Sequence, residues 1–188
     1  MNLFWIRAAF LADCHVVKMP LEYAQLLSTT YYFYEQIPPS GYKKTHAGHP
    51  CTIWTAQSAR HWHTVAQLAF AALREYTRRF GRVHKCWFKI AAMVRCPPVF
   101  HGKPPCFKPE TKLAEMGDFI DVPLCMPKTF HHPRATVAYA QYYLNKLRTV
   151  PKCARWNRDD RRFMHFAAVT GYLRTIESNQ LVRKRKRL

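Results

Sequence analysis

The clearest hydrophobic pattern in the chain lies between Ser58 and Phe80, where apolar residues recur at spacings of three and four. This spacing places them on one face of an α-helix. Ser58 is a suitable N-cap, and Gly81 is a suitable residue to end the helix. The pattern therefore predicts an amphipathic helix over 58–80, whose apolar stripe consists of Trp62, Val65, Ala66, Ala69, Leu73, Tyr76 and Phe80.

Weaker patterns predict three further helices and one short N-terminal element. A helix is expected at about 20–34, preceded by a turn or strand at 2–6. Another is expected from about Pro133 to Val150, because proline suits the first turn of a helix. A last helix is predicted over 159–177, where two aspartates stand at the N-terminus.

Two long segments lack periodicity and are expected to be loops. Residues 36–51 form one, and the proline-rich segment 96–127, a lid or a crossover, forms the other. The sequence thus predicts a mainly α-helical fold with a single domain over 1–180. The basic residues of 181–188 should form a disordered tail that acts as a solubilising end, a nuclear import signal or a phosphate-binding arm.

Charge is the strongest feature of the composition. Thirty Lys and Arg residues oppose eleven Asp and Glu, which gives a net charge of +19. Such an excess makes a polyanion the expected partner, and nucleic acid, either DNA or RNA, is the first candidate. No apolar run of about 18 residues is present, so no membrane-spanning helix is expected.

The seven cysteines are irregularly spaced, and no CxxC pair is present. We therefore expect reduced thiols in an intracellular protein. Neither a metal nor a cofactor is expected. A metal site built from the histidines and Cys51 of 46–63 is the less favoured interpretation, since two of these histidines are two residues apart and would project differently from a helix.

A polar stripe interrupts the apolar stretch 12–27. His15, Lys18, Glu22 and Gln25 follow one another at spacings of three and four, and Asp13 precedes them. On a continuous helix these four residues form one row, which suits a cleft and general acid–base chemistry. A solvated face with an incidental ion pair is the competing interpretation.

Pro20 complicates both interpretations of this stripe, because proline either starts or kinks a helix. On that view residues 13–18 form a loop that leads into the helix.

Several blocks of this sequence resemble a family of small proteins encoded by bacteriophages and large DNA viruses. The blocks are DCHVVKM at 13–19, EYAQLLST at 22–29, THAGHPCTIW at 45–54, EYTRRFGRVH at 75–84 and AYAQYYLNK at 138–146. The resemblance covers about the first 156 residues. It implies a protein of the infected host cell, in the cytoplasm or, in a eukaryotic host, the nucleus, or one packaged in the virion.

Two positions depart from that family pattern. Cys14 stands where the family has lysine, and Pro20 stands where it has an aliphatic residue. If the lysine is catalytic in the family, this protein has an altered activity or none.

A second group of residues suits contacts with phosphates or bases. Basic side chains neutralise phosphates, and aromatic rings stack on bases. For the aromatic members, burial in the core is an equally favoured interpretation. The predicted nucleic-acid contacts are Gln25, Lys43, Lys44, His46, His49, Trp54, Arg79, Arg82, His84, Tyr139, Tyr143 and Lys146.

These observations favour a nucleic-acid-binding protein that modifies or excises a base, or acts on a nucleotide. Asp13 or Glu22 would serve as base or electrostatic stabiliser, and His15 as acid–base partner. Lys18 would hold a phosphate or act as an amine nucleophile. The alternative is a basic nucleic-acid-binding or virion-associated structural protein without catalytic activity.

Overall fold

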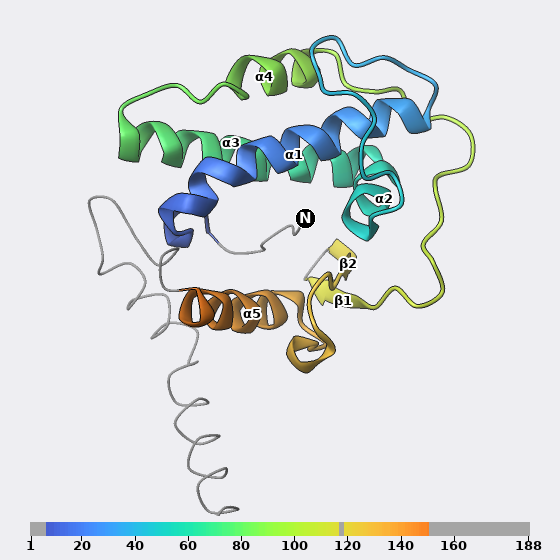
Figure 1. Cartoon of the computed structure of the whole chain (residues 1–188). Helices are drawn as coiled ribbons and strands as arrows, with labels where there is room; N and C mark the ends of the chain where they lie inside the picture. The colour runs from blue at the N-terminus through green and yellow to red at the C-terminus, as the bar shows by residue number, and fades with distance from the viewer. Residues whose placement is uncertain (1–6, 117–118, 151–188) are drawn as a thin grey trace, which may run out of the picture.

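Two long helices form the centre of the fold. The computed structural model describes residues 7–116 and 119–150. Helix α1 (Asp13–Phe33) lies beside helix α3 (Ala59–Phe80), as Figure 1 shows. The stripe predicted for 58–80 is buried at Trp62, Val65 and Leu73, and the indole N–H of Trp62 donates to the Leu27 carbonyl at 3.2 Å.

The ends of α3 agree with the sequence prediction. Ser58 caps the N-terminus, and its hydroxyl accepts a hydrogen bond from the His61 amide at 3.2 Å. Gly81 ends the helix with φ of +66°, a left-handed conformation that glycine adopts without a Cβ clash. The mainly α-helical fold class is confirmed by this and the other helices of the described residues.

Helix α1 begins at Asp13, well before the predicted start at about residue 20, and it continues through Pro20. The interpretation of 13–18 as a loop is therefore wrong. Tertiary contacts explain the early start, because the Ala12 amide, which precedes the first turn, donates to the Tyr143 hydroxyl at 2.7 Å. Burial of Val16, Met19 and Tyr23 supplies the stability that offsets the proline.

Two short helices were not predicted. Helix α2 (Pro50–Ala56) begins with a proline at its first position and with the His49 ring accepting from the Cys51 amide. Helix α4 (Trp87–Arg95) buries Ile90 and Met93. Both are too short for a helical period to stand out from the sequence.

The proline-rich segment 96–127 contains a hairpin that the sequence did not indicate. Strand β1 (Leu113–Met116) pairs antiparallel with β2 (Phe119–Pro123), with Ala114 opposite Val122. In Figure 1 the hairpin lies between α2 and α5 (Ala135–Thr149), and it contacts both. It therefore links α5 to α2, which in turn packs against α1 and α3.

Short 3-10 turns at Ala8–Phe10 (η1) and Lys128–Phe130 (η2) precede α1 and α5. Helix α5 begins close to its predicted start at Pro133. The predicted element at 2–6, the helix at 159–177 and the tail at 181–188 lie outside the described residues. Within the described part of the chain, no helix has both the length and the apolar character that a membrane crossing requires.

Candidate functional site

The polar stripe of α1 faces α5 at His15. The Tyr143 hydroxyl accepts from the Ala12 amide at 2.7 Å and lies 3.0 Å from His15 Nδ1. The amide can only donate, so the Tyr143 hydroxyl accepts from it, and the direction of the hydrogen bond between the hydroxyl and His15 depends on the tautomer of the ring.

His15 is only 5% exposed. Burial, together with the positive charges of Lys146 and Lys18, lowers the pKa of His15 to about 4. The ring is therefore neutral at physiological pH. A neutral imidazole can donate one hydrogen bond, but it is not an imidazolium acid.

Lys18 and Glu22 form the ion pair that their spacing predicts, at 2.9 Å. The Lys18 side chain is 66% exposed, whereas that of Glu22 is mostly buried. A hydrogen bond with Glu22, assisted by its charge, raises the pKa of Lys18. Lys18 is thus a protonated ammonium, which suits a phosphate contact and does not suit the predicted role of amine nucleophile.

The charge of Glu22 acts on two imidazoles, His15 of α1 and His49 at the start of α2. Burial lowers the pKa of both His15 and His49 to about 4, and the negative charge of Glu22 partly opposes the shift in each. The carboxylate therefore links the His15 environment to the N-terminus of α2. The site comprises Glu22, Lys18 and His15 together with Tyr143 and His49.

Asp13 belongs to a different cluster. Residues two apart on a helix project roughly 200° from each other, so Asp13 and His15 face different elements. Asp13 Oδ1 accepts from the Arg79 guanidinium of α3 at 2.9 Å. We therefore assign Asp13 to the α1–α3 contact, which corrects its predicted role as a holder of His15 or of a nucleophilic water.

Arg79 is the centre of that cluster and is 1% exposed. Its other two nitrogens donate to Glu75 Oε1 at 2.6 Å and to the Ala9 carbonyl at 3.0 Å. Burial alone raises the pKa of Glu75, but hydrogen bonds from Arg78 and Arg79 outweigh it and leave that pKa below its ordinary value. Arg79 thus joins the start of α1 to α3, and the predicted phosphate contact is wrong for this residue.

The aromatic residues predicted to stack on bases are buried. Trp54 is fully buried and stacks on His61, with ring centroids 4.0 Å apart. Tyr139 donates to the Pro123 carbonyl at 2.6 Å, and Tyr143 contacts His15 as described above. All three are 0% exposed, which confirms the alternative that they are core residues.

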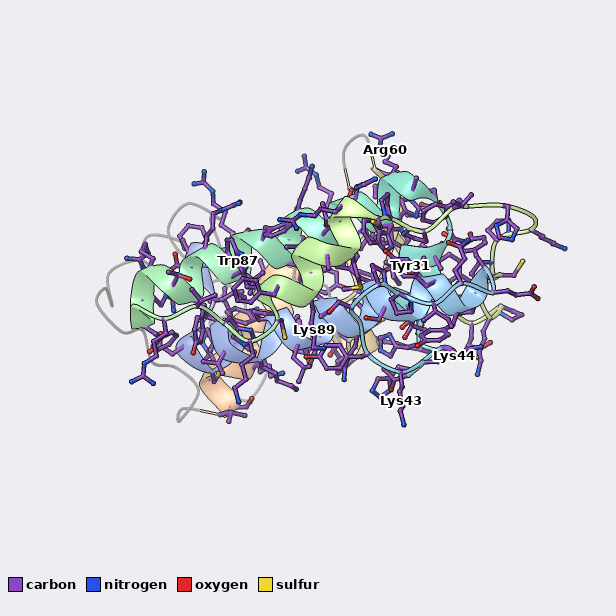
Figure 2. All side chains as sticks on the ribbon, turned by 90° about the horizontal axis from the view of Figure 1, so that it is seen from above. Tyr31, Lys43, Lys44, Arg60, Trp87 and Lys89 are labelled. Carbon is purple, nitrogen blue, oxygen red and sulfur yellow. The ribbon has the colours of Figure 1, made fainter. Side chains whose placement is uncertain are left out.

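Most of the remaining predicted contacts are accessible. Lys43, Lys44, His46 and Arg82 are exposed, whereas Gln25, His49, His84 and Lys146 are half-buried. Figure 2 shows Lys43 and Lys44 extending outward from the loop that follows α1, and Arg60 projecting on another side of the molecule. The cations are therefore distributed over several faces.

A cavity of about 650 Å³ lies beside the N-terminus of α2. His49 and Cys125 belong to its wall, and the segments 108–112 and 124–131 supply much of the rest. Its charged lining consists of Lys108, Lys112 and Lys128 with one acid, Glu110. The lining therefore favours an anionic ligand.

Cys125 joins His49 and Cys51 in a cluster that sequence spacing did not indicate. One ligand atom from each residue lies within 4.8 Å of the others, and the two sulfur atoms are 3.4 Å apart. Cys125 follows β2, so the unpredicted hairpin brings it to α2. The other histidines considered with Cys51 lie elsewhere, His61 against Trp54 and His63 beside Trp62.

Comparisons with protein-family models, with curated proteins and with solved structures find no significant match to this chain. The resemblance to the phage and large-DNA-virus family therefore stays a prediction from the sequence blocks.

Proposed function

We propose that this protein binds nucleic acid and acts on a base or nucleotide held in the cavity beside α2. The observation that carries the proposal is the cavity itself. Its volume of about 650 Å³ is within the range of small-molecule sites, and three lysines line it against one glutamate. A phosphorylated ligand matches both its size and its charge.

The distribution of ion pairs supports phosphate binding. Asp13, Glu22 and Glu75 are engaged with Arg79, Lys18 and Arg78. These acids are mostly buried and are occupied by those three cations, so they do little to neutralise the other exposed lysines of the surface. With a net charge of +19, the protein attracts a polyanion and loses affinity steeply as salt rises.

In the proposed reaction, Glu22, whose charge acts on His49 of the cavity wall, serves as the base. His15 donates a hydrogen bond from its neutral ring, and Lys18 holds a phosphate. Binding of a phosphate to Lys18 would compete with its ion pair to Glu22. The resemblance to viral and phage proteins is consistent with such a role in an infected cell.

A second candidate is a nucleic-acid-binding protein without catalytic activity. The burial of His15 and the pairing of Glu22 with Lys18 favour it, since a satisfied polar network is also typical of a structural contact. In that case the cations still bind phosphates, but nothing is turned over.

Two substitutions distinguish the enzyme from the nucleic-acid-binding protein without catalytic activity. Glu22→Gln removes the carboxylate, with Glu35→Gln, an exposed acid, as its control. Lys18→Met removes the ammonium, with the exposed Lys103→Met as its control. Binding of unrelated DNA and RNA duplexes is measured at several salt concentrations, and nucleosides from the treated substrates are analysed by mass spectrometry.

For an enzyme, Glu22→Gln keeps the affinity within about twofold and lowers turnover by about 100-fold or more. Lys18→Met makes the slope of log affinity against log salt shallower by about 0.9. Salt-insensitive binding of the unsubstituted protein would contradict the phosphate contacts. Salt-sensitive binding with no altered base or nucleotide would establish the non-enzymatic alternative.

A further inference from the structure

The His49–Cys51–Cys125 cluster combines the two side-chain types that zinc prefers. His49 and Cys51 stand at the start of α2, and Cys125 comes from the segment after β2. In the described part of the chain, these three residues form the group whose donor atoms all lie within 4.8 Å. Imidazole and thiolate ligands together are typical of zinc sites.

The spacing of the donors fits a tetrahedral ion. Two thiolates bound at about 2.3 Å with a tetrahedral angle are about 3.8 Å apart. The observed separation of the Cys51 and Cys125 sulfur atoms is 3.4 Å, so an ion requires a shift of only a few tenths of an ångström. Neither cysteine is in a disulfide bond in this structure.

The burial of the cluster also favours a metal. Cys51 is fully buried, and a cation would compensate the charge of a thiolate there.

Metal binding must be reconciled with the helix cap. His49 Nδ1 accepts from the Cys51 amide at 3.2 Å. Coordination through Nδ1 replaces this hydrogen bond with a metal bond, and coordination through Nε2 requires the proton to move to Nδ1. In either case the ion perturbs the first turn of α2, which gives an additional spectroscopic signal.

We propose that His49, Cys51 and Cys125 bind one zinc ion whose fourth coordination position faces the cavity. His49 and Cys125 belong to the cavity wall, so the position that the protein leaves open is directed there. Three protein ligands with an open position are the arrangement of catalytic rather than structural zinc sites. A water in that position is acidified by the ion and becomes available for hydrolytic chemistry on a ligand in the cavity.

The site can be tested without nucleic acid, so its failure is distinguishable from failure of the proposed function. Full-length protein is fully reduced, stripped of metal with a chelator and titrated with Co²⁺ under inert gas, and then with Zn²⁺. The proposal expects one Co²⁺ per chain, thiolate-to-cobalt charge-transfer absorption, tetrahedral ligand-field bands and displacement by Zn²⁺.

Three variants remove one ligand each while preserving shape. They are Cys51→Ser, Cys125→Ser and His49→Asn, in which asparagine remains a good N-cap. Each should weaken Co²⁺ binding more than about tenfold, since even residues that only support metal ligands cost 10- to 100-fold. Cys106→Ser, at an exposed thiol, is the control and should bind as the unsubstituted protein does.

Circular dichroism of each variant identifies any that fail to fold. Co²⁺ binding by the folded variants then tests the proposal. Absence of Co²⁺ absorption in the reduced protein would overturn the proposal. Binding that survives loss of either cysteine would also overturn it, because the ion would then be held elsewhere. So would a Cys51–Cys125 disulfide that forms equally fast with and without Zn²⁺.

Discussion

Replacing Arg79 with methionine tests whether one buried guanidinium holds the start of α1 on α3. The change removes donors to Glu75 Oε1 at 2.6 Å, to Asp13 Oδ1 at 2.9 Å and to the Ala9 carbonyl at 3.0 Å. Methionine keeps the unbranched stem of the side chain but lacks the guanidinium. The loss of stability therefore reports on the polar contacts together with the buried space that the guanidinium fills.

Breaking a buried ion pair by removing one partner costs about 3–5 kcal/mol. Here the lower end applies, because Glu75 keeps two hydrogen bonds from Arg78 and the Asp13 side chain is 22% exposed to water. We expect a loss of about 3 kcal/mol in the free energy of unfolding. For a protein of this size that corresponds to a decrease in Tm of about 6–12 °C.

Arg78→Met provides the matched control. Arg78 contacts the same carboxylate, but its side chain is 41% exposed, and surface pairs contribute about 0–1 kcal/mol. Urea denaturation followed by circular dichroism gives the free energy of unfolding for each variant, and calorimetry gives the Tm. Equal losses for the two arginines would refute the assignment of Arg79 as the central contact.

Three further outcomes follow from the structure. The folded pKa of His15 is lowered to about 4 from 6.5, so the unfolded state binds the extra proton and stability is lost as pH falls below 6.5. Between pH 7 and 5 the contribution of His15 to this loss reaches about 2 kcal/mol. The substitution His15→Gln should remove that contribution, which urea titrations at the two pH values measure. An unchanged pH dependence would contradict the burial argument. Gly81→Ala places a Cβ at φ of +66° with no atom within 4 Å, so it should cost about 1 kcal/mol through backbone strain alone, seen as a lower urea midpoint at constant m-value. The double substitution Lys43→Met/Lys44→Met should make the salt slope of duplex binding shallower by up to about two units, and an unchanged slope would place the phosphate contacts elsewhere.

Local sequence patterns predicted the parts of the fold that depend on local physics. Helix α3 has a long apolar period, a serine cap and a glycine end, and all of these appear in the structure. The early start of α1 depends instead on a hydrogen bond from Ala12 to Tyr143, which is more than a hundred residues away. No local pattern carries that information. Propensity therefore favoured Pro20 as a boundary, and tertiary contacts overrode it.

The candidate site shows the same division. The Lys18–Glu22 pair follows from a spacing of four on one helix and was predicted. The partner of Asp13 is on α3, and the partner of His15 is on α5, so neither follows from spacing along α1. Cys125 joins His49 only because a hairpin forms in a proline-rich segment. The odd number and irregular spacing of the cysteines did not indicate that Cys125 lies beside His49 and Cys51.

The aromatic residues show why composition alone misleads. Tyrosines near lysines suit base stacking, but Tyr139 and Tyr143 use their hydroxyls to satisfy Pro123, Ala12 and His15 inside the core. A buried tyrosine requires such a polar partner, and helical spacing does not reveal whether one is present.

Pro20 removes one hydrogen bond from the middle of α1. Because proline has no amide hydrogen, the Val16 carbonyl lacks its usual helical donor, and the adjacent Val17 carbonyl accepts from the His84 ring at 3.1 Å. Lys18 and Glu22 stand on opposite sides of the proline, so their ion pair spans the turn that lacks this hydrogen bond. An anion that binds Lys18 competes with the ion pair, so the turn around Pro20 is the part of the helix that ligand binding would affect first.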